Sequence, residues 1–290
     1  MNSNQYNKSK VTVVIPCYND GDYIDDAIQS ILNQSYKDYN IIVVDDGSTD
    51  QNTINKLNNL NYPNTTVLYK KNGGVSSARN FGAKNSHSEY ILFLDADDYF
   101  EKTHLAKAVD VLDNNPGIGA VTAYSRFFYE RDYEKTINYY KPKGGGVKNF
   151  LLENNAGSNS LVRYKSWRDA GGFDEKLLSH EDWDFWIRVT KNGWLIYTIP
   201  EVLVNYRLTE KSKYKKFKDR KLELLKRIYE NHQDIYKEYV VECLYEKEKQ
   251  IHRYKEMINE VNNEIKRSPT FIIGSYITFP YRFVKKLFKT

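Results

Sequence analysis

The chain has 290 residues, of which 40% are hydrophobic and 28% charged, so it can bury the core of one large domain or of two smaller ones. Its two cysteines, Cys17 and Cys243, lie far apart and in no Cys/His cluster, which argues against a disulfide framework or a structural zinc site and favours a reducing cytoplasm. No apolar run is long enough for a signal peptide or a membrane-spanning helix, so we expect neither.

Charge is distributed unevenly along the chain. Residues 211–290 carry 20 Lys and Arg against 11 Asp and Glu, whereas residues 1–210 carry 23 against 27. We therefore predict a first domain at 1–210 and a basic helical extension at 211–290. A basic extension suits an anionic membrane surface, a nucleic acid or solubility alone. We expect no nucleic-acid partner, because residues 1–210 are net acidic and Glu is spread through residues 223–264.

The first half of the chain alternates short β-rich runs with helix-length segments. These runs are residues 11–15, 41–44, 67–69, 91–94 and 120–124. Between the first two, apolar residues recur at helical spacing from Ile24 to Leu32, which indicates a βαβ unit. The alternation predicts an α/β fold with a mainly parallel twisted sheet flanked by helices.

Residues that suit a nucleotide follow the first two strands. Pro16, Cys17 and Tyr18 end the first strand, and Asp45 and Asp46 end the second. In a parallel sheet both ends open onto one crevice, where a ring can stack on a base and a carboxylate can accept a hydrogen bond from a base or ribose. Taken alone, Tyr18 also fits a core position and Asp46 a turn.

The run at 91–94 ends in three carboxylates, Asp95, Asp97 and Asp98. Clustered like charges repel, so the pattern predicts a cation among them. Mg²⁺ and Mn²⁺ prefer oxygen ligands and are commonly held by one or two carboxylates together with substrate phosphates. We predict a metal role for Asp95 and Asp97, and for Asp98 alone we favour a cap on the next helix.

The middle of the chain is less regular. Residues 125–147 mix aromatic and charged side chains and end in three glycines, which predicts a flexible loop that meets substrate. Regular structure resumes near residues 157–162. The acidic pair Glu181 and Asp182 then precedes a helix start at 184–189, and such a pair fits either a helix N-terminus stabilised by the helix dipole or a catalytic site. The neighbouring Trp183 and Trp186 fit either a sugar subsite or the core.

The last part of the chain has helical patterns. Residues 211 to about 266 contain no Gly or Pro. An apolar run at 271–279 precedes Pro280, after which apolar residues share one helix face and basic residues the other. This pattern fits either a helix in a membrane interface or one docked on the domain or a dimer partner. We predict an anionic membrane surface as a partner of 271–290 and the helical extension as a contact in a homo-oligomer.

Four ordered motifs carry a family resemblance: residues 13–19 (VVIPCYN), 44–50 (VDDGSTD), 73–80 (GGVSSARN) and 94–98 (LDADD). Together they resemble the family 2 glycosyltransferases of GT-A fold, and the resemblance covers about residues 10–210. It implies an inverting transfer of a sugar from a nucleotide-diphosphate sugar donor, usually a UDP-sugar, to an acceptor hydroxyl. It also implies a divalent metal cofactor, Mn or Mg.

The resemblance further implies roles for single residues. It puts Pro16, Tyr18 and Asp46 around the base, Arg79 near the donor phosphates, Asp95 and Ala96 near the ribose and metal, and Asp97 as principal metal ligand. Asp182 becomes the catalytic base, and Glu181 orients it or touches the acceptor. Many members have a His that helps bind metal or diphosphate where this chain has Thr209, so the third protein ligand stays open.

We therefore expect a metal-dependent hexosyl- or N-acetylhexosaminyltransferase. We expect it to add single sugars, because the Gln-x-x-Arg-Trp element of processive synthases is absent. The expected acceptor is a glycan or a lipid-linked glycan in cell-surface polysaccharide or glycolipid synthesis. The expected place is the cytoplasm, peripheral on the inner face of the membrane.

Two alternatives stay open. A nucleotidyltransferase should have a Gly-rich phosphate loop after its first strand, which residues 16–21 do not supply. A non-catalytic glycan-binding protein of the same fold would not need the acids Asp46, Asp95, Asp97 and Asp182.

Overall fold

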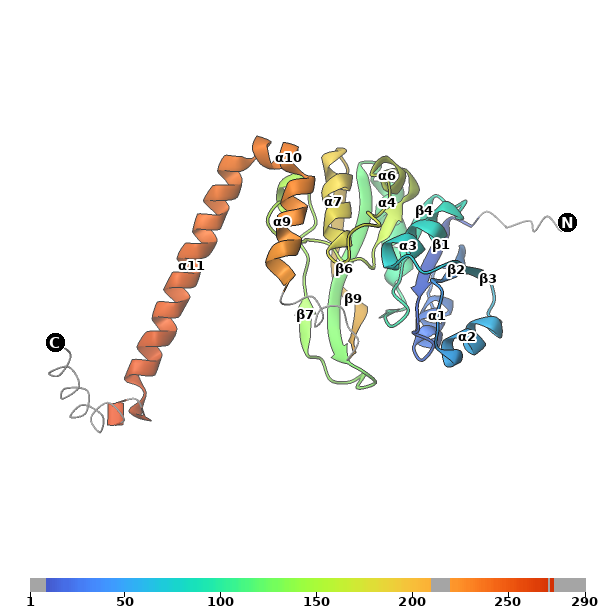
Figure 1. Ribbon diagram of the computed structural model, residues 1–290, viewed down its shortest axis with the longest axis horizontal. Helices are drawn as coiled ribbons and strands as arrows, with labels where there is room; N and C mark the ends of the chain where they lie inside the picture. The colour runs from blue at the N-terminus through green and yellow to red at the C-terminus, as the bar shows by residue number, and fades with distance from the viewer. Residues whose placement is uncertain (1–8, 210–219, 271, 274–290) are drawn as a thin grey trace. The chain divides into compact units, whose positions relative to one another are not determined.

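The computed structural model describes residues 9–209, 220–270 and 272–273 (Figure 1). The strands are β1 (Val11–Cys17), β2 (Tyr39–Asp45), β3 (Thr65–Tyr69), β4 (Tyr90–Phe93), β5 (Tyr99–Phe100), β6 (Ile118–Tyr129), β7 (Asn138–Tyr140), β8 (Leu161–Arg163) and β9 (Leu195–Leu208). The helices are α1 (Ile24–Leu32), α2 (Gln51–Asn58), α3 (Val75–Lys84), α4 (His104–Asn114), α5 (Val147–Phe150), α6 (Tyr164–Asp169), α7 (Glu181–Lys191), α9 (Lys221–Asn231), α10 (Gln233–Glu238) and α11 (Val240–Arg267). The chain divides into two compact units, residues 1–235 and 236–290.

One sheet runs through the first unit. Among residues 9–209 its strand order is β3-β2-β1-β4-β8-β6-β9-β5, with β7 paired to β6. Strands β3, β2, β1 and β4 are parallel, whereas β8 is antiparallel to both β4 and β6. The long strands β6 and β9 run parallel side by side (Figure 1). The predicted α/β class is therefore confirmed, and the sheet is mixed beyond β4.

The alternation of side chains along β1 explains the layers. Val11, Val13 and Ile15 point into a core that also contains the apolar residues of α1 and α4. Val14 points to the other face, where an added Cβ on Gly82 of α3 would meet its Cγ1 at 2.4 Å. Helices thus cover both faces of β1, which is why its residues are buried throughout.

Several elements differ from their predicted extents. Strand β6 continues to Tyr129 and β7 follows at 138–140, so the prediction of one loop over residues 125–147 was wrong for these segments. Helix α7 begins at Glu181, which puts the acidic pair inside its first turn. The long helix expected over 211–266 is interrupted at His232 and at Tyr239 within the part of the chain that the structure describes.

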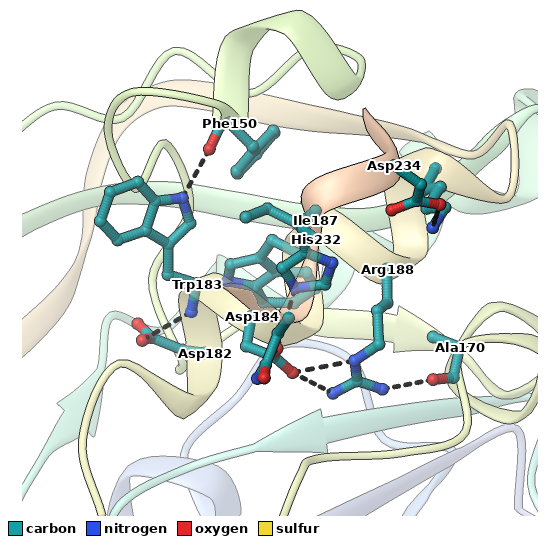
Figure 2. A network of polar contacts seen from close by, with 12 residues as sticks. Phe150, Ala170, Asp182, Trp183, Asp184, Ile187, Arg188, His232 and Asp234 are labelled. Atoms are coloured by element: carbon teal, nitrogen blue, oxygen red, sulfur yellow. Dashed lines mark hydrogen bonds and ion pairs between the residues drawn. The ribbon is translucent and has the colours of Figure 1, made fainter. Parts of the chain in front are cut away.

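Helix α9 packs on the first unit through buried Leu224, Ile228 and His232. His232 Nε2 lies 2.9 Å from Asp184 Oδ1 of α7, and Arg188 bonds the same carboxylate (Figure 2). The predicted domain boundary at 210/211 lies outside the described residues and stays a prediction. The same holds for the membrane segment at 271–290, of which only Ile272 and Ile273 are described. No helix among the described residues combines the length and the apolar character needed to cross a bilayer.

Candidate active site

The loops that follow β1 and β2 are joined through Asn19. Its side-chain oxygen accepts hydrogen bonds from the backbone N–H groups of Thr49 (2.8 Å) and Asp50 (3.1 Å). Asn19 has φ 58°, a left-handed conformation that Asn tolerates better than most residues. Beside this junction Pro16 is buried in β1, whereas the ring of Tyr18 is 44% exposed. Tyr18 is therefore not a core residue and presents an aromatic surface at the strand end.

Asp46 is buried and shapes the glycine turn before α3. It accepts hydrogen bonds from Lys70 Nζ (2.6 Å), Gly73 N (3.0 Å) and Gly74 N (2.7 Å). Gly74 has φ 86°, which favours glycine at this position. A carboxylate has about four acceptor positions, and most of those of Asp46 are in use. Each oxygen accepts two hydrogen bonds, so the predicted contact with the base would have to share an oxygen that is already bonded.

Arg79 of α3 joins two carboxylates that lie far apart in the sequence. Its guanidinium is 2.5 Å from Asp95 Oδ1 and 3.2 Å from Glu181 Oε1, and it lies 5.3 Å from the ring centroid of Phe173. Burial opposes the charge, but Asp95 and Glu181 outweigh it and raise the pKa of Arg79. The structure thus brings together three residues that the sequence predicted separately.

The carboxylates after β4 have three different surroundings. Asp95 is held by Arg79 and accepts from Ser158 Oγ at 3.4 Å. Burial, together with repulsion from Asp95 and Asp20, raises the pKa of Asp97 to about 7. Asp98 is fully buried and caps no helix.

Asp98 instead fastens β9 and the segment before β8 to this turn. Its oxygens accept from Arg207 N at 2.8 Å and from Asn159 Nδ2 at 2.5 Å. Ala96, between the two predicted metal ligands, is buried. The interpretation of Asp98 as a helix cap was therefore wrong, and its role is to hold the turn that carries Asp95 and Asp97.

The surroundings of Asp95 and Asp97 fit a divalent cation. Burial and the charges of two neighbouring carboxylates disfavour the ionised form of Asp97, and a bound cation would relieve the repulsion. No cluster of three or more His, Cys, Asp or Glu with ligand geometry exists among the described residues. Two protein carboxylates completed by substrate phosphates and water are a usual arrangement for Mg²⁺. Thr209, the position at which the third protein ligand was left open, is buried.

Asp182 is oriented by two hydrogen bonds. Its Oδ2 accepts from Asn154 Nδ2 at 2.8 Å. Its Oδ1 accepts from Trp183 N at 2.8 Å (Figure 2). Burial and the adjacent Glu181 raise the pKa of Asp182 to about 6, although both hydrogen bonds act in the opposite direction. The arrangement gives a fixed carboxylate that is ionised at neutral pH and still basic.

Both tryptophans after Asp182 belong to the core. Trp183 donates from Nε1 to the carbonyl of Phe150 at 2.6 Å (Figure 2). Trp186 is fully buried. The sugar-subsite interpretation is therefore wrong for Trp186 and is not supported for Trp183.

Several residues around the site were not predicted from the sequence. Asn154, Ser158 and Asn159 come from a segment without periodicity. Tyr140 Oη donates a hydrogen bond of 2.6 Å to the backbone carbonyl oxygen of Asn154 and so fixes this residue. Tyr206 lies near the same acids, since burial and then Asp98 raise its pKa. The only available signal was the polar, Asn-rich composition of residues 154–159 between two apolar runs.

Comparison with known proteins gives a family match. The sequence model described as Glycosyl transferase family 2 matches residues 12–170. An uncharacterized glycosyltransferase of Rickettsia bellii is 31% identical over 189 residues, which are 64% of this chain and 27% of that protein. The chain thus spans about a quarter of the length of this relative.

Two further proteins are similar to this chain. TuaG of Bacillus subtilis, a glycosyltransferase provisionally assigned to teichuronic acid biosynthesis, is 27% identical over 213 residues, covering 71% of this chain and 81% of TuaG. The crystal structure of S. aureus TarS 1–349 with UDP-GlcNAc has a TM-score of 0.56 at 23% identity, covering 70% of this chain and 60% of that one. At this identity the likeness to TarS shows a shared fold.

Proposed function

The chain belongs to the glycosyltransferases of family 2, with the expected GT-A fold, and from this we propose that it moves one sugar from a nucleotide-diphosphate sugar to an acceptor hydroxyl with inversion. The observation that carries the proposal is the pair of bonds made by Arg79. They join Asp95, predicted on the donor side, to Glu181, which precedes the predicted base. A transfer reaction needs donor and acceptor groups held together in this way.

The proposed donor is a UDP-sugar that delivers a hexosyl or N-acetylhexosaminyl group. Tyr18, exposed at the end of β1, offers a surface on which a base can stack. Pro16 and Asp46 lie in the same two strand-end segments. The structure of TarS with UDP-GlcNAc supports this choice of nucleotide, and the assignment of TuaG supports a product in cell-surface polysaccharide.

We assign the metal to Asp95 and Asp97, with Mn²⁺ or Mg²⁺ completed by the donor phosphates. When bound, the ion supplies positive charge to the departing diphosphate. Arg79 holds Asp95 at Oδ1, which leaves Oδ2 facing Ser158. The guanidinium of Arg79 is buried between two acids, so we assign it no direct contact with the donor phosphates. Its role toward them is to fix Asp95, which would hold the metal that the phosphates complete.

Asp182 is the proposed general base, which takes the proton of the acceptor hydroxyl as that oxygen attacks the sugar. Asn154 and the Trp183 N–H keep its carboxylate in one orientation. Glu181 raises the basicity of Asp182 by its charge and is itself fixed by Arg79. Glu181 is thus a positioning residue.

The first test is donor hydrolysis with a panel of nucleotide sugars and Mn²⁺ or Mg²⁺. We expect nucleoside diphosphate to be released from one sugar, and the release to be lost in Asp97→Ala and Asp182→Ala. The control Asp110→Ala, which changes an exposed acid on α4, should keep it. In a parallel assay with a nucleoside triphosphate and sugar 1-phosphates, release of pyrophosphate would indicate a nucleotidyltransferase instead. UDP binding without turnover of any sugar, with acceptor glycans present, would indicate a glycan-binding protein, and no UDP binding would refute the proposal.

A lipid-linked acceptor on the inner face of the membrane is the remaining proposal, and it rests on the sequence of 271–290. Removal of these residues should reduce sedimentation of the protein with anionic vesicles. Equal sedimentation of the full and shortened chains would contradict it.

A further inference from the structure

Helix α11 has 28 residues and no buried side chain. Large apolar side chains nevertheless recur along it at spacings of three and four, with one interval of seven across Lys247. Each is between 43% and 63% exposed: Val240, Leu244, Ile251, Tyr254, Ile258, Val261 and Ile265. Most helices gain their stability in water by packing such a face against something else. We therefore expect this stripe of seven apolar side chains to pack against a partner.

The spacing of the stripe is that of a coiled coil. In heptad notation the a positions are Leu244, Ile251, Ile258 and Ile265, and the d positions are Val240, Lys247, Tyr254 and Val261. Seven of these eight positions are apolar, over four heptads. A repeat of seven sustained over this length is the signature of a helix that packs along another helix.

The charge of α11 indicates which class of partner fits it. The helix contains six Lys and Arg and six Glu, so it has no net charge at neutral pH with His neutral. An anionic membrane or a nucleic acid would attract a basic helix far better than a neutral one. A neutral helix with an apolar stripe fits another helix of similar composition.

The sequence of the stripe is complementary to itself in the antiparallel direction. With Ile251 opposite Tyr254 of a second copy, the same register puts Leu244 opposite Val261 and Val240 opposite Ile265. Lys247 then faces Ile258 and can extend its amine to water. A parallel pair would instead set Lys247 against its own copy, where like charges repel.

The flanking charges agree with this direction. In the antiparallel register Glu248 lies beside Lys255 of the second copy, and by symmetry this ion pair occurs twice. In a parallel pair Glu248 would lie beside Cys243, so no such ion pair would form. We propose that α11 is a self-association surface, on which the α11 of a second copy of this chain packs antiparallel.

The test uses the full chain in sedimentation velocity over a range of concentrations. A dimer is expected, and the double variant Ile251→Glu with Ile258→Glu should raise its Kd at least about 100-fold. Tyr245→Glu is the matched control, because Tyr245 is as exposed as the stripe but lies outside it. Circular dichroism checks that helix content is kept. A monomer at all concentrations, or a dimer insensitive to the double variant, would overturn the surface.

The direction has its own test. Glu248→Lys should weaken the dimer about 10-fold, because two attractive pairs become repulsive. The charge swap Glu248→Lys with Lys255→Glu should restore the wild-type Kd. If Glu248→Lys leaves Kd unchanged, the antiparallel arrangement is wrong. Donor hydrolysis does not enter either experiment, so failure here is independent of the proposed function.

Discussion

Asp182 shows how the pKa of one side chain can be shifted without a cation in direct contact with it. Burial and Glu181 raise its pKa to about 6, and the bonds from Asn154 and the Trp183 N–H limit the rise. A general base works best when its pKa lies just below the working pH, where it is ionised but still basic. The hydrogen bond from Asn154 is one of the contacts that lower this pKa, and it thereby extends the acid limb of activity to lower pH.

The variant Asn154→Ala should move this limb to higher pH. Loss of the hydrogen bond raises the pKa of Asp182 further, and a protonated base is inactive, so kcat/KM at the acidic end should fall several-fold while the alkaline plateau stays within about two-fold. The measurement is kcat/KM as a function of pH with donor and acceptor. Asn192→Ala, which changes an Asn at the end of α7, serves as control. An unmoved limb would mean that Asp182 is not the group that titrates.

At this scale the sequence predicted which acids belong to the candidate site but not which residues hold them. Asp95, Asp97 and the pair Glu181 and Asp182 stood out because each follows or precedes a periodic segment. Their partners Asn154 and Asn159 come from a stretch without a pattern, so no local rule selects them. Whether the acids act as proposed stays a prediction.

The element that positions Arg79 is α3, and Gly82 lets it approach the sheet. A Cβ at this position would lie 2.4 Å from Val14 Cγ1 and 3.2 Å from Val44 Cγ2. The side chains of β1 and β2 therefore leave no room for a methyl group. Because Arg79 lies on the same helix, the spacing between α3 and the sheet also sets where the guanidinium meets Asp95.

We expect Gly82→Ala to destabilise the protein by about 1–3 kcal/mol through overpacking, which lowers Tm by about 3–10 °C. Donor hydrolysis should fall as well, because α3 must shift. Thermal unfolding and the hydrolysis assay measure the two effects. The control is Gly117→Ala, where an added Cβ meets nothing within 4 Å. Equal Tm values for the two variants would contradict the close packing.

Among the elements, β1, β2 and β4 were predicted as strands, whereas the short antiparallel strand β8 and the long strand β9 were not. Strands β1, β2 and β4 are apolar runs followed by polar turns, a pattern that needs no tertiary information. Strand β8 has only three residues, too few to show a period, and its direction depends on Asn159 and Ser160, which contact the end of β4. The start of α7 was predicted three residues late, at 184, because its N-cap His180 is not a usual capping residue and has φ 60° without a capping hydrogen bond from its side chain.

On the scale of the whole molecule, α9 decides where the first unit ends. Leu224 and Ile228 are buried, and His232 completes the hydrogen bonds of the buried Asp184. Hydrogen bonds from His232 and Arg188 overcome the effect of burial and lower the pKa of Asp184, so this carboxylate is charged and needs its partners. Asp184 follows the proposed base by two residues on α7.

A chain that ends at residue 235 should therefore unfold at nearly the Tm of the full chain, whereas one that ends at 210 should unfold well below it. Each buried Leu or Ile contributes about 1.5–3 kcal/mol, and Asp184 would lose a partner. Calorimetry of the two truncated chains measures this. If the shorter chain is as stable as the longer, the predicted boundary at 210/211 is the right one.

The open edge of the sheet has a consequence for how the protein behaves at high concentration. Strand β3 ends the strand order of the part of the chain that the structure describes, and an edge strand is a template on which other chains can polymerise. Here the strand has five residues, Pro63 precedes it, and Lys70 and Lys71 follow it. Short length, proline and lysine are features that keep sheet edges from joining, so this edge is protected against aggregation during synthesis and storage.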